Sequence, residues 1–186
     1  HRPDTAAEAV KLKASDSTSR YLAGGTDMIV NVRRGIETPE TMIDLTAIAD
    51  ITAIATDGDD LRIGAGVKLA DLAADETIIR DYPAVAQAAA SVAGPTHRAY
   101  GTIGGNLCLD TRCTYYNQNE EWRRSISYCM KAEGEVCWVA PSSPRCWAVS
   151  SGDSVPMLCA LGAEITLHST EGERIVPLAE LFNDDG

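Results

Sequence analysis

The sequence lacks the features that mark a membrane protein or a nucleic-acid-binding protein. No apolar run approaches the roughly 18 residues of a membrane-spanning helix, and no basic stretch followed by an apolar one indicates a signal peptide. The 27 acidic residues outnumber the 16 basic ones, so the net charge is -11. Nucleic-acid backbones and anionic lipids are negatively charged and attract positively charged protein surfaces. These absences predict a cytoplasmic protein that binds neither nucleic acid nor a membrane.

Two common nucleotide-binding motifs are also missing. No glycine-rich loop ends in Gly-Lys-Ser or Gly-Lys-Thr, which excludes a phosphate-binding loop of the nucleotide-hydrolase type. Gly64-Ala65-Gly66 begins like a dinucleotide fingerprint, but Leu69 occupies the position of the third glycine. We therefore exclude a Rossmann domain.

The cysteines lack the closely spaced pairs that are typical of structural zinc sites. All six lie between Cys108 and Cys159. Nothing in the sequence indicates secretion, and thiols stay reduced in the cytosol. A cysteine cluster in such a protein indicates metal or redox chemistry rather than disulfides.

Two glycine turns are present instead. Arg20–Ala23 is predicted to be a strand that runs into Gly24-Gly25, and Thr26 is predicted to cap a helix over residues 27–32. A strand, a glycine pair and a helix start together expose N–H groups to an anion. Gly101–Asn106 is a second turn of this backbone-exposing kind. Each turn alone also fits a ligand-free connection, but two of them favour a clamp on the two ends of one elongated ligand.

The remaining pattern alternates short helices and strands. Residues 68–93 are predicted to be helical with a break at Tyr82-Pro83, and hairpins are predicted around Asp57–Asp60 and around Glu171-Gly172. Residues 155–161 form a further predicted helix, which begins after Ser154.

Two groups of cysteines can be separated by their context. Cys159 lies in an apolar helix and Cys108 follows the glycine turn in an apolar context, so both are predicted to be structural. The other four lie in a polar and aromatic segment: Cys113, Cys129, Cys137 and Cys146. They are separated by 15, 7 and 8 residues, so each comes from its own loop. This spacing favours an iron–sulfur cluster over a single zinc ion, although a zinc site and a loop with chance cysteines both remain open.

The segment from Arg112 to Ser150 has its own charge and composition. It carries five basic and four acidic residues, a net charge of +1, while the rest of the chain carries -12. Six of the ten aromatic residues lie there, enough to shield a cofactor from water. Nearby basic groups would raise the potential of an anionic cluster. The segment also suits docking of an acidic electron donor, which we expect Arg123 and Arg124 to face.

Three stretches resemble a known family. LAGGTD at Leu22–Asp27 and GTIGGN at Gly101–Asn106 resemble the two flavin-binding motifs of the FAD subunit in the xanthine dehydrogenase and CO dehydrogenase family. Ser151–Ile165 resembles the segment that follows the second motif, but here residues 109–150 intervene. This insertion is similar to that of one branch, the β subunit of 4-hydroxybenzoyl-CoA reductase, whose FAD subunit carries an extra [4Fe–4S] cluster.

The resemblance implies an α+β fold, namely the two-subdomain FAD-binding fold of the molybdenum hydroxylase (PCMH-type) family with a cysteine-rich loop insertion. The first subdomain is expected over residues 1–50. The second is expected over residues 51–186, interrupted by a [4Fe–4S]-binding insertion at 109–150. The family subunit also has a C-terminal domain that helps to cover the flavin. Its counterpart is missing here, so we expect the natural chain to be longer.

The resemblance also implies the site residues. No catalytic residue is expected in this chain. The expected cluster ligands are Cys113, Cys129, Cys137 and Cys146. The residues expected to contact FAD are Arg20, Tyr21, Leu22, Ala23, Gly24, Gly25, Thr26, Asp27, Thr102, Gly104, Gly105, Asn106 and Asp153.

The implied function is electron transfer. Electrons from a ferredoxin would enter at the cluster, pass to FAD, and continue through a [2Fe–2S] subunit to a molybdenum-cofactor subunit. There an aromatic acyl-CoA would lose its ring hydroxyl. Two alternatives remain open: an FAD subunit of a related xanthine, aldehyde or CO dehydrogenase-type hydroxylase whose insertion holds zinc or nothing, and a non-enzymatic zinc-binding scaffold.

Overall fold

A computed structural model describes residues 1–58, 60–183 and 185–186. The chain forms two compact units, and each is described by itself. Unit 1 comprises His1–Thr26, Pro39–Cys108 and Gly152–Phe182. Unit 2 comprises Asp27–Thr38, Leu109–Ser151 and Asn183–Gly186. The predicted subdomain boundary at residue 50 stays a prediction.

The first part of unit 1 places the end of a strand at the first glycine turn. Strand β1 (Arg20–Leu22) pairs in parallel with β2 (Met42–Asp44), and helix α1 (Ala6–Ser15) contacts β2. Two 3-10 turns follow, η1 (Leu45–Ala47) and η2 (Ala49–Ile51). A small core of Ala9, Ile43 and Ile48 joins the helix to the strand pair.

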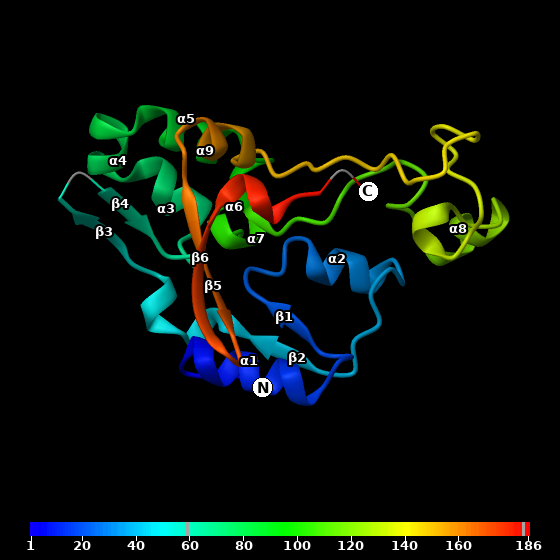
Figure 1. The fold of residues 1–186 in the computed structure, drawn as a ribbon, viewed down its shortest axis with the longest axis horizontal. Coiled ribbons are helices and arrows are strands. Elements are labelled where there is room, and N and C mark those ends of the chain that lie inside the picture. The colour runs from blue at the N-terminus through cyan, green and yellow to red at the C-terminus, as the bar shows by residue number, and fades with distance from the viewer. Residues whose placement is uncertain (59, 184) are drawn as a thin grey trace. The chain divides into compact units, whose positions relative to one another are not determined.

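The larger part of unit 1 combines two hairpins with short helices (Figure 1). Strands β3 (Ile54–Asp57) and β4 (Asp60–Ile63) are antiparallel, as are β5 (Glu164–Ser169) and β6 (Gly172–Pro177). Both hairpins are as predicted, although Asp59 of the first turn lies outside the described residues. The helices and the last turn are α3 (Leu69–Ala74), α4 (Glu76–Asp81), α5 (Pro83–Ser91), α6 (Pro95–Arg98), α7 (Ile103–Leu107), α9 (Val155–Ala160) and η4 (Leu178–Leu181).

Local signals explain where these helices begin. Pro83 starts α5, because its fixed φ suits a first helical position, and this confirms the predicted break. The sequence pattern missed a second break at Asp75, whose side chain accepts the Ile78 N–H at 2.9 Å and so caps α4. Leu72 and Ile78 are fully buried in the larger core.

Unit 2 contains α2 (Met28–Arg33), α8 (Glu120–Ser125) and the 3-10 turn η3 (Met130–Ala132). Its long cysteine segment is closed at the base by backbone hydrogen bonds between Arg112 and Val149 of 2.8 and 3.1 Å. None of the helices in the described stretches of either unit combines the length and apolar character needed to span a bilayer.

Candidate functional site

The first glycine turn offers free backbone donors. As predicted, the chain passes from β1 through Gly24-Gly25 into α2. Gly25 has a φ of 72°, a left-handed conformation that suits glycine. Among the described residues, the N–H groups of Gly24, Gly25 and Thr26 donate to no acceptor. Consecutive free N–H groups in such a turn form an anion-binding concavity. One detail of the prediction is wrong, because Asp27 rather than Thr26 occupies the N-cap position of α2.

The second glycine turn lies against the first within unit 1. A methyl group placed on Gly24 would lie 1.9 Å from the carbonyl oxygen of Tyr100, and one on Gly101 would lie 3.4 Å from Thr26 Oγ1. Only glycine at position 24 allows so close an approach of two backbones. The structure therefore brings together the two turns that the sequence analysis paired.

Most N–H groups of the second turn have partners, contrary to the prediction, although the N–H of Thr102 donates to no acceptor among the described residues. The N–H of Ile103 donates to Val67 O and that of Gly104 to Ala65 O, both at 2.9 Å. The N–H of Gly105 donates to Thr102 Oγ1 at 3.1 Å, and that of Asn106 to Thr102 O at 3.0 Å. An antiparallel bridge between Thr102 and Lys68 pairs Ile103 with Val67. Thr102 also caps α7 and so accepts from Gly105 and Asn106. A methyl group on Gly104 would lie 2.7 Å from Ala65, so this glycine serves backbone packing.

Asn106 holds the segment around Asp153 next to the second turn. Its side chain is 7% exposed, and Oδ1 accepts the N–H of Ser154 at 3.0 Å. Asp153 itself is exposed. Ser154 occupies the N-cap position of α9, where the helix was predicted to begin, but its buried hydroxyl has no hydrogen-bond partner among the described residues. Buried hydroxyls are normally satisfied, so this one is a candidate contact for a ligand.

These features of unit 1 fit FAD. A pyrophosphate needs clustered N–H donors, which Gly24, Gly25 and Thr26 supply. Tyr21 would contribute through its backbone, since its hydroxyl is directed to the carbonyl oxygen of Ala9 at 3.5 Å. The roles of all the predicted FAD-contact residues stay predictions.

Both carboxylate oxygens of Asp27 in unit 2 have a partner. Oδ2 accepts from Asn31 Nδ2 at 2.9 Å, and Oδ1 forms an ion pair with Arg112. This ion pair has no signature in the sequence, where Arg112 is only one of several basic residues, because the two residues lie 85 positions apart.

Replacement of Asn106 by alanine tests the link to Asp153. The Asn106→Ala change leaves the buried Ser154 N–H without a partner, so we expect a loss of about 1–3 kcal/mol in the free energy of unfolding and weaker FAD binding. Thermal unfolding and flavin titration measure the two effects. Gln87→Ala, at an exposed position on α5, is the control and should change neither. An unchanged FAD affinity in Asn106→Ala would show that this hydrogen bond does not serve the flavin site.

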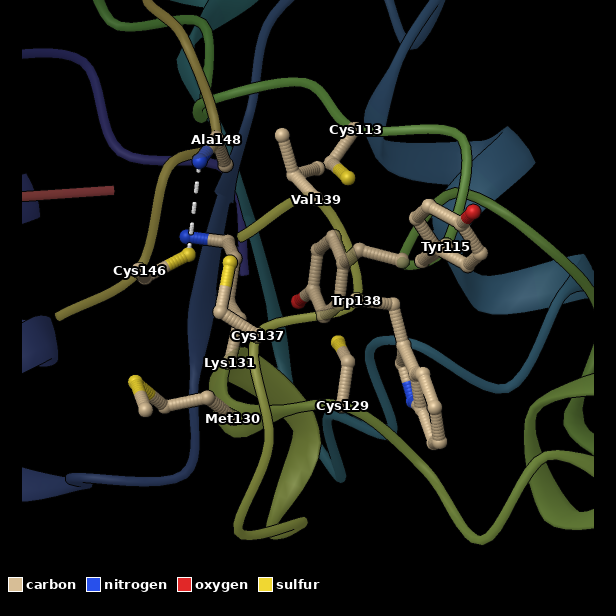
Figure 2. A pocket seen from close by; sticks show the side chains of 11 residues that line it. Cys113, Tyr115, Cys129, Met130, Lys131, Cys137, Trp138, Val139, Cys146 and Ala148 are labelled. Carbon is tan, nitrogen blue, oxygen red and sulfur yellow. Dashed lines mark hydrogen bonds between the residues drawn. The ribbon is translucent and has the colours of Figure 1, made fainter. Parts of the chain in front are cut away.

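The four predicted ligand cysteines line one pocket in unit 2, and Figure 2 shows their sulfur atoms directed toward its interior. The other lining residues are Tyr115, Tyr116, Met130, Lys131, Trp138, Val139 and Ala148. No carboxylate or imidazole lines this pocket of described residues. A donor set made only of thiols is the set that [4Fe–4S] clusters use.

The pocket is not a preformed site for a single metal ion. Within the described part of the chain, no three His, Cys, Asp or Glu side chains lie close enough together to hold one. A tetrahedral zinc would require all four sulfur atoms at about 2.3 Å from one point. A cluster presents four separate iron corners, so its thiolates stand farther apart. The all-cysteine donor set matches the donor type of a cluster, and no group of the described residues is arranged to hold a single ion.

Two of these cysteines have distinctive surroundings. Burial raises the pKa of Cys137, but hydrogen bonds from the backbone N–H groups of Ala140, Trp147 and Val139 outweigh it, and the net pKa is lowered. A lowered pKa favours the thiolate, which is the form that binds metals.

Cys129 follows two residues with left-handed backbones, Ser127 (φ 58°) and Tyr128 (φ 60°). Three hydrogen bonds hold Tyr128 in this conformation, from its N–H to Arg123 O (2.8 Å), from Trp138 Nε1 to its carbonyl oxygen (2.6 Å), and from its hydroxyl to Glu120 (2.6 Å). Strained residues persist where the surroundings over-determine them, often at functional sites.

The other two cysteines stay outside the pocket. Cys159 is partly buried against the larger core of unit 1, which confirms its predicted packing role. Cys108 is exposed beyond the last turn of α7.

Arg123 does not face a docking partner, so that prediction is wrong. It is 4% exposed, whereas the side chain of Arg124 is 72% exposed. Arg123 Nη2 donates to the carbonyl oxygen of Gly35 at 2.8 Å and to Glu120 Oε2 at 2.7 Å. These partners draw it into the interior of unit 2.

Comparison with known proteins places the chain in a family. A family model described as the FAD binding domain in molybdopterin dehydrogenase matches residues 1–186. The chain is 32% identical over 191 residues to the aldehyde oxidoreductase FAD-binding subunit PaoB of Escherichia coli (strain K12), covering 100% of this chain and 60% of the relative. It is 36% identical over 110 residues, 58% of this chain and 37% of the relative, to the xanthine dehydrogenase FAD-binding subunit of Escherichia coli O157:H7.

Solved structures agree with this placement. CO dehydrogenase from Oligotropha carboxidovorans matches with a TM-score of 0.71 at 27% identity, covering 96% of this chain and 49% of that one. CO dehydrogenase from Hydrogenophaga pseudoflava has the same fold, with a TM-score of 0.72 at 23% identity over 96% of this chain and 50% of that one. The predicted PCMH-type fold is thus confirmed. The chain belongs to the family of FAD-binding domains in molybdopterin dehydrogenases, the FAD subunits of the molybdenum hydroxylases.

Proposed function

We propose that this chain is the FAD- and [4Fe–4S]-binding electron-transfer part of a molybdenum-containing oxidoreductase complex. Family membership supports FAD. The observation that supports the cluster is that four cysteines line one pocket, which no carboxylate or imidazole of the described residues lines. The proposed partners are a molybdenum-cofactor subunit and a [2Fe–2S] subunit. Bound FAD supplies one- and two-electron chemistry, which lets such a subunit connect different donors and acceptors.

The residues of this chain would bind and shield these groups rather than react. The N–H groups of Gly24, Gly25 and Thr26 would hold the FAD pyrophosphate, while Asn106 keeps Asp153 in place. In the insertion, the aromatic side chains that line the pocket would exclude water. Lys131, which also lines it, would offset the negative charge of a four-thiolate cluster.

The resemblance of the insertion to that of the 4-hydroxybenzoyl-CoA reductase β subunit supports one reaction for the complex. Electrons from ferredoxin would pass through the cluster and FAD toward the molybdenum site, where an aromatic acyl-CoA is dehydroxylated. A second candidate is aldehyde oxidation with electron flow in the opposite direction. It is favoured by the 32% identity with an aldehyde oxidoreductase subunit, an alignment that runs through all of this chain and so includes the insertion.

Cofactor content tests the proposal. The native protein, purified anaerobically at full length, should contain about four irons and one flavin per chain and absorb visible light from both groups. Flavin without iron would remove the cluster from the proposal, and a colourless protein would overturn it. Assays of the complex with an aldehyde and a dye, and with reduced ferredoxin and 4-hydroxybenzoyl-CoA, separate the two reactions.

A further inference from the structure

Helix α2, which follows the first glycine turn, is held at both ends by the cysteine insertion, and all of these contacts lie within unit 2. At its start, Asp27 forms the ion pair with Arg112. At its end, the carbonyl oxygen of Gly35 accepts from Arg123 Nη2 at 2.8 Å. Gly35 has a φ of 67° and directly follows the C-cap residue Arg34, a position that favours glycine.

The tie at the start of α2 is adjacent to a proposed cluster ligand. Arg112 directly precedes Cys113. The backbone of Arg112 also pairs with Val149, so it lies where the two ends of the insertion meet. Cys113 is thus covalently adjacent to the residue that holds Asp27.

The tie at the end of α2 has the same relation to a second ligand. Tyr128 directly precedes Cys129, and its hydroxyl donates to Glu120 Oε1 at 2.6 Å. Glu120 Oε2 accepts from Arg123, which donates onward to Gly35. Hydrogen bonds from Tyr128 and then Arg123 lower the pKa of Glu120, so its carboxylate stays charged. A continuous hydrogen-bonded chain thus connects the neighbour of Cys129 to the end of α2.

The burial of Arg123 indicates that its hydrogen bond to Gly35 contributes to the structure of unit 2. Its Nε has no hydrogen-bond partner among the described residues. A buried guanidinium loses hydration that an exposed one keeps, and removal of its partners costs several kcal/mol. An arginine that served only the insertion could remain in solvent, as Arg124 does. Arg123 is instead buried where it binds a carbonyl oxygen of the α2 segment.

We propose that Arg112 and Arg123 are positioning residues that couple metal loading of the cysteine pocket to the order of α2 and of the adjoining flavin loop at residues 24–27. The iron-loaded protein then binds FAD more tightly than the iron-free protein. This coupling rests on the proposed function, because it needs both FAD and a metal cluster to bind. Since coupling free energies are reciprocal, bound FAD also makes the cluster harder to remove.

The test compares FAD affinity with and without iron. FAD is titrated onto the deflavinated, full-length native protein before and after chelation of its iron, and flavin fluorescence reports the dissociation constant. We expect the constant to be about tenfold higher in the iron-free protein. Arg123→Met should reduce this difference to less than about twofold, and Arg123→Lys, which keeps one donor for Gly35, should retain part of it. Arg124→Met, an exposed neighbour on the same helix, should retain all of it.

Hydrogen exchange gives a second measurement that needs no variant. Removal of iron from the wild-type protein should speed amide exchange at residues 27–38 and leave α5 unchanged. Equal FAD affinities in the loaded and iron-free protein, or unchanged exchange at residues 27–38, would overturn the coupling while FAD and iron binding stand. A wild-type protein that binds no FAD or no iron would instead overturn the proposed function, and the coupling with it.

Discussion

Replacement of Gly24 by alanine should abolish the close contact between the two glycine turns and weaken FAD binding by about tenfold or more, which corresponds to a loss of about 1.4 kcal/mol or more. The new methyl group would lie 1.9 Å from Tyr100 O and 2.4 Å from Tyr100 C. Both are backbone atoms, so no side-chain rotation relieves the clash. The turns must separate, and the free N–H groups of Gly25 and Thr26 move with them. Flavin titration measures the loss, and thermal unfolding measures the strain.

Gly94→Ala is the matched control for this change. Gly94 lies in the same unit and has a φ of -104°, which alanine adopts readily. A methyl group there would have its nearest contact at 3.9 Å, to His97 Nδ1. Because Gly94 is the N-cap residue of α6, we expect at most about 1 kcal/mol of destabilisation and no change in FAD affinity. If the two variants bind FAD equally well, the close approach at Gly24 is not required for the flavin site.

Features with a local cause could be predicted from the sequence. The strand, glycine pair and helix at residues 20–33 follow from side-chain pattern and from the positive φ that Gly25 supplies. The break before Pro83 follows from the restraint on proline. The N–H groups of Ile103 and Gly104 in the second turn were mispredicted because their acceptors, Val67 and Ala65, lie more than thirty residues away.

Arg123 and Arg124 illustrate the same limit within one helix. The two adjacent arginines have the same intrinsic preference for solvent, and the sequence pattern does not separate them. Their different exposure is set by Gly35, which lies 88 residues from Arg123 and contributes a carbonyl oxygen. Tertiary contacts of this kind have no signature in the spacing of a short helix.

For the cysteines, the sequence could predict which four lie together but not the distances between their sulfur atoms. Context separated the four cysteines of the polar and aromatic segment from Cys108 and Cys159, and the structure gathers those four at one pocket. Spacing could not give the distances between the sulfur atoms, because irregular loops place them. Those distances, rather than the number of thiols, distinguish a single-ion site from a cluster.

Replacement of Cys137 by alanine should prevent binding of the proposed cluster. Cys137 is 5% exposed and lines the pocket with the other three cysteines. Its loss leaves three thiols for four iron corners, and alanine cannot substitute for a thiolate. We expect the iron content to fall from about four per chain to less than about one, with loss of the cluster absorbance and of its reduced-state paramagnetic resonance signal. At saturating FAD the flavin absorbance should remain, because the first glycine turn is unchanged.

Cys108→Ala is the matched control, since it removes the same group from an exposed cysteine outside the pocket. It should keep its iron and its spectrum. A protein whose Cys137→Ala variant keeps full iron content, or whose Cys108→Ala variant loses it, has its metal ligands elsewhere.

The Cys137→Ala variant also tests the path of electrons through the protein. If Cys137→Ala keeps FAD and still exchanges electrons with the molybdenum site, but no longer with a one-electron protein donor or acceptor, the cluster connects the flavin to that external partner. In that case electrons enter or leave the complex through the insertion, and they pass to or from the flavin bound at the two glycine turns.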